Sequence, residues 1–407
     1  MRVFLTCAAL AAVLLPSTLA GQTAPLTEAD ALARLSPASP RVAAIRAAIE
    51  IARADLAAAG RWPNPRLSIT REAVAGVAEH MTTVLQPLPL TGRRNLEIKA
   101  ASALVDASIS RADEEMRRAR AELRRAFSDL RAAQIREREL ARARDRLSEL
   151  GGMLARREAA GDAAGFDRLR AEREMLDIEA DRSIASTERA RAQATLASFF
   201  SGPMDPATLV AAETASAAPA LPPVEGLIER AEAARGEILA LRHDIEAARF
   251  SERAAARRLI PEPEAIGGAK SSSAAGGDIG SVFGVQATLP LFDRARPERA
   301  LARARRTQLE ARLEAFRIAL RSQVIALRTA AIERRALADR YRATAFNSAD
   351  QVERIAQISY EAGERGILEL LDAYRTSAGA RVRQAALDAS AREAEVELEF
   401  ISGWEIP

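Results

Sequence analysis

The chain has 407 residues, of which 28% are charged and only 4% are aromatic, and its formal net charge is +3. So low a content of aromatic side chains argues against a large globular core, whereas abundant Ala and Arg are typical of long helices packed on small side chains. Arginine alternates with Glu along the predicted helices, as in REREL, which is typical of a solvated helical face and argues against a nucleic-acid partner.

Residues 1–20 predict a cleavable secretory signal. One positive charge at Arg2 precedes an apolar run over residues 3–15, and small residues end the segment at Ala20. The run is shorter than the ~20 apolar residues that a transmembrane helix needs. The only cysteine, Cys7, lies inside this segment, so we expect a mature chain without a disulfide or a lipid anchor.

An internal repeat organises the rest of the chain. Pro-x-Pro ends a helix at residues 63–65 and again at 261–263, because proline cannot continue helical hydrogen bonding. Leu-Pro-Leu then opens a long helix at residues 88–90 and again at 289–291. A proline-rich linker over 201–223 joins the copies, so we expect a first repeat at 21–223 and a second at 224–407.

Apolar residues spaced alternately by four and three predict long antiparallel coiled-coil helices. An uninterrupted helix over 93–158 would reach ~100 Å at ~1.5 Å per residue. Its seam is predicted at Ala112, Met116, Ala119, Leu123, Ala126, Leu130, Ala133, Leu140, Ala143, Leu147, Leu150 and Leu154. The returning arm is expected to pack through Leu176, Ala180, Ser183, Thr187, Ala190, Ala194 and Ala197. The second copy repeats the pattern at Leu309, Leu313, Phe316, Leu320, Val324, Leu327 and Ala331.

Two β-hairpins are predicted between the proline landmarks and the long helices, over 66–74 with 80–88 and around 282–289. Phe283, Val285 and Ala287 alternate with small or polar residues, so one face of that strand is apolar. A sheet within lipid must close into a barrel, because every backbone group needs a partner there. Membrane barrels begin at about eight strands, so several chains must contribute if these four strands enter a membrane.

SYEAGER at residues 359–365 is followed by LLDA at 370–373. With these motifs, the Pro-x-Pro stretches and the Leu-Pro-Leu starts, the chain resembles the TolC family of outer-membrane efflux proteins. The resemblance covers nearly all of the mature chain, in order and in both copies.

The resemblance implies a mainly α fold with a small β part. Long antiparallel coiled-coil helices would form a periplasmic α-barrel, and the four strands of each chain would contribute to a trimeric twelve-stranded outer-membrane β-barrel. It also implies a homotrimer in outer-membrane lipid that works with a periplasmic adaptor and an inner-membrane pump, expected to be of the resistance-nodulation-division type.

Four residues fall by position on the family's periplasmic gate: Tyr360, Arg365, Glu369 and Asp372. Glu369 and Asp372 are three residues apart and share a helix face, so threefold symmetry would make two carboxylate rings that select cations or bind a basic neighbour. Alternatively, both are ordinary surface acids near a helix start.

Glycines mark the two helix reversals, at Gly161 and Gly165 in the first copy and at Gly363 and Gly366 in the second. Glycine accepts the positive φ of a tight turn. By resemblance these tips also contact the adaptor; a purely structural turn is the alternative.

No enzyme, cofactor or metal site is expected. His80 and His243 lie far apart in different elements, and no nucleophile motif or phosphate loop occurs. A periplasmic adaptor is a competing class, but the compact β domains that flank an adaptor's hairpin are not recognisable. A structural coiled coil of cytosolic type would not explain the signal segment or the hairpins.

If the chain is the outer-membrane exit duct of such a system, two uses are possible: export of small molecules or metal ions, and protein secretion by a type I system. We expect efflux, because it is the commoner use of this plain form, and an outer-membrane location with a large periplasmic part.

Overall fold

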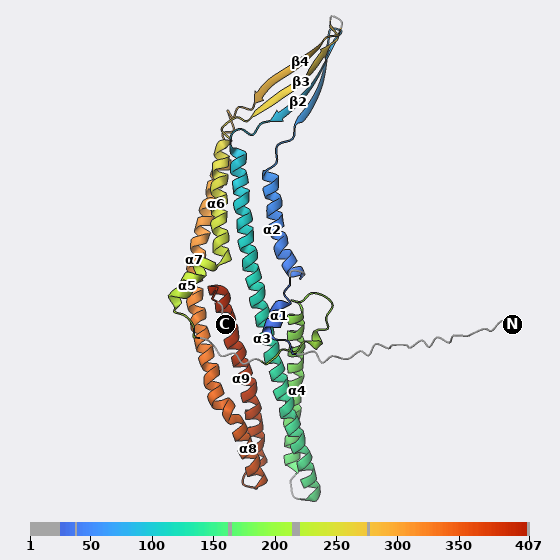
Figure 1. Cartoon of the computed structure of the whole chain (residues 1–407). Coiled ribbons are helices and arrows are strands. Elements are labelled where there is room, and N and C mark those ends of the chain that lie inside the picture. The colour runs from blue at the N-terminus through green and yellow to red at the C-terminus, as the bar shows by residue number, and fades with distance from the viewer. Residues whose placement is uncertain (1–24, 37–38, 162–164, 214–219, 275–276, 405–407) are drawn as a thin grey trace, which may run out of the picture.

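The computed structural model describes residues 25–36, 39–161, 165–213, 220–274 and 277–404 (Figure 1). The predicted signal segment, including Cys7, therefore lies outside the described residues. The first half contains α1 (Glu28–Ala33), α2 (Pro40–Ala59), β1 (Arg66–Val74), β2 (Val77–Pro87), α3 (Arg93–Ala160), α4 (Gly165–Ala197) and the 3-10 helix η1 (Pro206–Thr208). The second contains α5 (Val224–Ala234), α6 (Gly236–Arg257), β3 (Pro263–Ser272), β4 (Ile279–Ala287), α7 (Arg296–Tyr341), the π-helix η3 (Arg342–Phe346), α8 (Asn347–Glu361) and α9 (Ile367–Ser402).

The molecule is mainly helical with one four-stranded sheet, as predicted. The sheet lies at one end of the long axis, and the reversals between α3 and α4 and between α8 and α9 lie at the other (Figure 1). Each half follows the predicted order of helix, two strands, long helix, reversal and returning helix. Among the described residues, no helix is both long and apolar enough to cross a membrane.

Helix α3 is the central rod. Its 68 residues correspond to ~100 Å at ~1.5 Å per residue. Gly92 and Gly161 bound it in the left-handed region, with φ of 73° and 80°. Ten of the twelve predicted seam residues are buried, and Met116 and Ala133 are half-buried. Helix α3 contacts α2, α4, α6 and α9, so it holds both halves of the chain.

The seam predicted for α4 is wrong. Leu176 is 58% exposed, whereas the buried residues of this helix are Ala171, Ile178, Ala185, Gln193 and Leu196. Alanine is so frequent in α4 that two apolar stripes fit the same periodicity, and the packed one starts from Ala171. The predicted stripe faces away from the rest of this chain.

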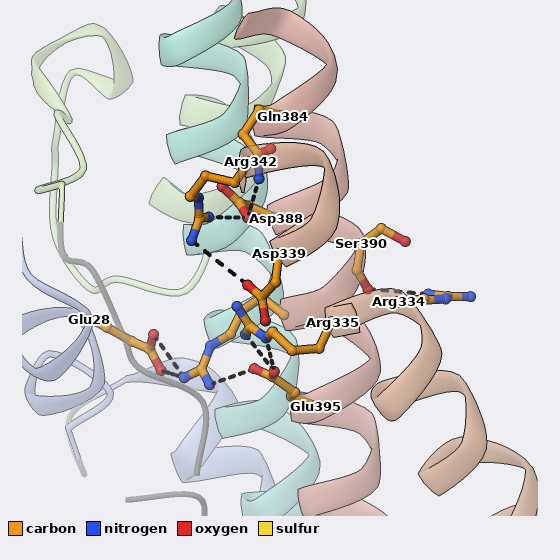
Figure 2. Close-up of polar contacts among 10 residues, drawn as sticks. Glu28, Arg334, Arg335, Asp339, Arg342, Gln384, Asp388, Ser390 and Glu395 are labelled. Atoms are coloured by element: carbon orange, nitrogen blue, oxygen red, sulfur yellow. Dashed lines mark hydrogen bonds and ion pairs between the residues drawn. The ribbon is translucent and has the colours of Figure 1, made fainter. Parts of the chain in front are cut away.

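Ion pairs bind the two halves together near the middle of the rod. Glu28 at the start of α1 pairs with Arg124 of α3 and accepts a hydrogen bond of 3.0 Å from Arg392 of α9. Glu395, also on α9, pairs with Arg335 of α7 (Figure 2). These ion pairs thus connect α1 to helices of both repeats.

The π-helix interrupts the rod of the second half between α7 and α8. Arg342, its first residue, pairs with Asp388 of α9 at 2.5 Å, and Asp388 also accepts a hydrogen bond from Gln384 at 2.9 Å (Figure 2). The interruption is therefore fixed to α9 by polar contacts.

The strands form one antiparallel sheet in the order β1-β2-β3-β4. β2 begins at Val77, earlier than predicted, because Ala75 and Gly76 make a two-residue turn with positive φ and the ladder continues to the Val74–Val77 pair. β4 likewise begins at Ile279 rather than near 282. Phe283 and Val285 are 83% and 75% exposed on one face, which confirms the predicted apolar face.

A polar contact joins the sheet to the helices. Glu262, directly before β3, accepts hydrogen bonds from Thr91 Oγ1 at 2.9 Å and from Arg93 Nη2 at 2.8 Å. These bonds lower the pKa of Glu262, the one from Arg93 most. The start of α3 in the first half is therefore tied to the start of β3 in the second.

Candidate functional site at the helix-reversal tips

The second tip is a tight turn set by glycine. Gly363 has a φ of 74°, its N–H donates to the Tyr360 carbonyl at 3.0 Å, and the Glu364 N–H donates to the Ser359 carbonyl at 2.9 Å. These bonds satisfy carbonyls that the end of α8 leaves without helical partners. Gly366 then precedes the first residue of α9 with an extended backbone, φ −82°, so the positive φ expected of the tip glycines is wrong for Gly366 and likewise for Gly165. The predicted turn role of Gly363 is confirmed.

Apolar side chains fix how α9 leaves this turn. Ile367, Leu370 and Leu371 are buried in the cluster that α3, α4, α8 and α9 share at this end of the molecule. Glu369 and Asp372 lie on the opposite face of α9 and are exposed. The expected common face of these two acids is confirmed; their place in a gate stays a prediction.

Tyr360 has a different environment from the other gate candidates. Its half-buried ring packs against the same apolar cluster. The Arg157 guanidinium of α3 lies over this ring, with its carbon 5.7 Å from the ring centroid. Tyr360 therefore connects the tip of the helical hairpin α8–α9, the second hairpin, to the tip of the helical hairpin α3–α4, the first hairpin.

The structure does not gather the four gate candidates into one cluster. Arg365, Glu369 and Asp372 are exposed and form no ion pair with any described residue of the chain. Their side chains therefore have no ionic partner among the described residues.

The first tip shares the glycine turn. Gly161 has a φ of 80° and ends α3, and Gly165 begins α4. Residues 162–164 between them lie outside the described part of the chain. Just past the turn, Phe166 and Leu169 are 65% and 58% exposed, so this tip offers apolar surface. Contact of either tip with an adaptor stays a prediction.

A buried ion-pair cluster, which the sequence did not reveal, lies farther up the same helices. Arg381 of α9 is 3.7 Å from Glu139 of α3 and 3.7 Å from Glu353 of α8. Glu353 also pairs with Arg146 of α3 and accepts a hydrogen bond of 2.7 Å from Ser377 Oγ. We call these five residues the inter-hairpin cluster, because they hold α8 and α9 of the second helical hairpin against α3 of the first.

The inter-hairpin cluster also affects its neighbours. Asp350 forms an ion pair with Arg381 and accepts a hydrogen bond from its guanidinium, and this hydrogen bond lowers the pKa of Asp350. Burial raises the pKa of Tyr374 on the same helix pair, and the charge of Glu353 adds to this effect. One sequence signal existed: Glu353 occupies a seam position between the buried Ala349 and Ala356.

Metal binding finds no support among the described residues, where no group of three or more His, Cys, Asp or Glu side chains could hold an ion. His80 lies on β2 and His243 on α6, in separate elements as predicted.

Comparison with known proteins agrees with this architecture. Residues 227–404 match the outer membrane efflux protein family. A membrane protein from Pseudomonas aeruginosa is 23% identical with a TM-score of 0.78, covering 92% of this chain and 93% of its own. The Campylobacter jejuni CmeC outer membrane channel is 14% identical with a TM-score of 0.79, covering 92% and 85%.

The outer membrane protein VceC from Vibrio cholerae is also similar, at 17% identity and a TM-score of 0.75, covering 92% of this chain and 96% of its own. At these identities the likeness shows the fold. No curated protein sequence matches this chain.

Proposed function

We propose that the chain, whose residues 227–404 match the outer membrane efflux protein family, is one protomer of a trimeric exit duct in the outer membrane. The observation that carries this proposal is the four-stranded sheet at one end of a ~100 Å helical rod, whose outer strands β1 and β4 each have one edge without a neighbouring strand among the described residues. Three four-stranded sheets joined edge to edge would make one closed barrel of twelve strands, with no free edge left.

The two repeats supply this barrel in equal parts. After removal of a signal at 1–20, the repeat at 21–223 would give β1 and β2 and the repeat at 224–407 would give β3 and β4. The long helices of three chains would continue the barrel as a hollow periplasmic bundle. The exposed apolar stripe of α4, which includes Leu176, is then available to a neighbouring protomer.

The tips would close the periplasmic end of the duct. Tyr360, Arg365, Glu369 and Asp372 are our candidates for the gate, and threefold symmetry would turn the two exposed acids into carboxylate rings. Gly161, Gly165, Gly363 and Gly366 shape the tips that would meet a periplasmic adaptor, which in turn joins an inner-membrane pump of the resistance-nodulation-division type. The exposed Phe166 and Leu169 beside the first turn suit such a contact.

The proposed cargo is small molecules or metal ions that pass through without a resident cofactor. Protein secretion by a type I system is the alternative use of the same duct. Co-purification of the chain with its pump separates these uses, because a drug or metal transporter supports efflux and a peptide-exporting ATPase supports secretion.

Fractionation of the expressed full chain tests the proposal. We expect it in the outer membrane as a trimer that resists SDS and dissociates on heating. A soluble periplasmic monomer would contradict the duct and favour an adaptor.

Single-channel recording of the purified trimer tests the gate. Replacing Glu369 and Asp372 by Ala should raise the conductance and weaken block by divalent cations. Unchanged conductance and block would remove both acids from the constriction, while leaving the duct itself intact.

A further inference from the structure

We propose that Arg71 of β1 and His80 of β2 form a binding site for the phosphate of a lipid headgroup in the outer leaflet. The proposal rests on the outer-membrane barrel proposed above. It concerns the lipid that surrounds the barrel, not the cargo inside it.

The register of the sheet puts these two residues on its lipid-facing side. Arg71 and His80 are cross-strand partners, and along their strands they alternate with the opposite face. Their own face carries Leu67 and Ile69 on β1, Val84 on β2 and Phe283 and Val285 on β4, all exposed. The other face includes Thr83, which is only 6% exposed, so the sheet curves around that side. The apolar convex face is the one that suits lipid.

The charges of the sheet divide unequally between its two faces. The carboxylates of the four strands, Glu72, Glu79 and Glu264, all fall on the concave face. There Lys270 pairs with Glu79 at 2.7 Å, and Arg66 pairs with Glu264. Arg71 is on the convex face, where the strands hold no carboxylate, and it makes no ion pair with a described residue. Its positive charge therefore has no counter-ion within the sheet.

The height of the pair matches the edge of an apolar band. The β1–β2 turn lies at the end of the sheet remote from the helices, which in the proposed orientation faces outward (Figure 1). Exposed apolar side chains of the β4 segment run from Leu289 to Ile279, which spans ~33 Å along a strand or ~25 Å of height when tilted by ~40°. Ile279 pairs with Ser271, Ser271 pairs with His80, and His80 pairs with Arg71, so Arg71 and His80 share the cross-strand row of Ile279 at the turn end of this band.

Arginine at the edge of the apolar band lies at the level of the lipid headgroups, whose phosphates are anionic. A guanidinium on the lipid face is far better tolerated there than at the middle of the membrane. Guanidinium binds phosphate through two parallel hydrogen bonds, and an imidazole N–H on the neighbouring strand can donate a third. Cross-strand Cβ atoms are ~4.5–5.5 Å apart, so both side chains can reach one phosphate group.

Native mass spectrometry of the full-chain trimer tests this site. Trimers would be released from nanodiscs of equal phosphatidylcholine and phosphatidic acid, and the retained phosphatidic acid would be counted. We expect Arg71→Gln to lower retention several-fold, His80→Gln to lower it less, and Arg71→Lys to recover part of it. The control is Lys270→Gln, which removes the same charge from the concave face and should leave retention unchanged.

Three outcomes would overturn the site: equal loss in Arg71→Gln and Lys270→Gln, no loss in either, or displacement of the lipid by millimolar inorganic phosphate, which would mark a site for the free ion. Channel conductance of the same samples separates this inference from the proposed duct. Inserted, conducting trimers without selective retention reject the lipid site alone, whereas a chain that never inserts rejects both.

Discussion

The guanidinium carbon of Arg157 on α3 lies 5.7 Å from the centroid of the Tyr360 ring on α8, so the tips of the two hairpins touch through this pair. Such cation–π contacts stabilise by about 0.5–1 kcal/mol at partly exposed sites, which corresponds to a ~2–5-fold change in a two-state equilibrium. We therefore expect Tyr360→Ala to raise the resting conductance of the trimer by about that factor.

Tyr360→Phe is the matched control for this prediction. It keeps the ring and its packing against the apolar cluster, so its conductance should stay near that of the parent. If the conductance of Tyr360→Phe rose as much as that of Tyr360→Ala, the effect would belong to the hydroxyl. If the conductance rose in neither variant, the contact between Arg157 and Tyr360 would not keep the channel closed.

The inter-hairpin cluster should dominate the stability of the tips. Arg381 is 13% exposed, and Arg381→Gln would remove the buried cation that Glu139 and Glu353 share, leaving them with the more exposed Arg142 and Arg146, respectively. Loss of one partner from a buried ion pair costs about 3–5 kcal/mol, and the remaining arginines offset part of this, so the dissociation temperature of the trimer should still fall by several degrees.

Arg375→Gln on the same helix is the control. The Arg375 side chain is 66% exposed and its guanidinium lies 3.5 Å from Glu174, so the loss of stability should be within about 0.5 kcal/mol. Adding Glu353→Gln to Arg381→Gln should recover part of the stability, because it removes a buried carboxylate that Arg381 no longer neutralises and leaves only the more exposed Arg146 without this partner. Equal effects of Arg375→Gln and Arg381→Gln would show that the cluster is not a clamp.

Glu262 should make the junction between sheet and helices sensitive to acid. Its hydrogen bonds to Arg93 and Thr91 hold its pKa below the usual value, so the unfolded chain binds more protons than the folded chain. The stabilisation is therefore full above the ordinary pKa of about 4.5 and is lost as the pH falls through the depressed pKa of the folded state.

Glu262→Gln should thus lower trimer stability by about 1–2 kcal/mol at pH 7, and the difference from the parent should shrink below pH ~4. Heat dissociation followed on SDS gels across pH measures both effects. Glu298→Gln, which affects the exposed pair with Arg258 at 3.2 Å, should change stability little at any pH. A Glu262→Gln deficit that stays constant with pH would contradict the assigned cause.

Elements that carry distinctive residues can be predicted from the sequence, and elements built of repeated small residues cannot. Large leucines such as Leu123, Leu130 and Leu147 fix one stripe of α3, and turn residues bound the strands, so these elements were predictable. In α4 the alanines fit several stripes, so the spacing alone does not identify the buried one. The inter-hairpin cluster was missed because Arg and Glu on a helix usually face water, and only tertiary packing buries Glu353 and Arg381.

The exposed gate acids raise a different difficulty. Glu369 and Asp372 have their proposed partners around a threefold axis, so neither one sequence nor one chain contains the geometry that would define their role. Their common face follows from spacing alone, and their function requires the assembled trimer.

Two adjacent glycines in β3 should respond in opposite ways to alanine. A Cβ on Gly268 would lie 2.2 Å from the Thr82 carbonyl oxygen and 2.8 Å from Thr83 Cα, whereas a Cβ on Gly267 would meet nothing within 4 Å in the chain. Because backbone atoms of β2 cannot move aside without breaking the β2–β3 ladder, Gly268→Ala should sharply reduce the yield of SDS-resistant trimer. Gly267→Ala, on the convex face, should assemble like the parent. Comparable yields from both variants would mean that β2 and β3 do not approach as closely in the assembled barrel, and would argue against the sheet curvature that puts Arg71 on the lipid side.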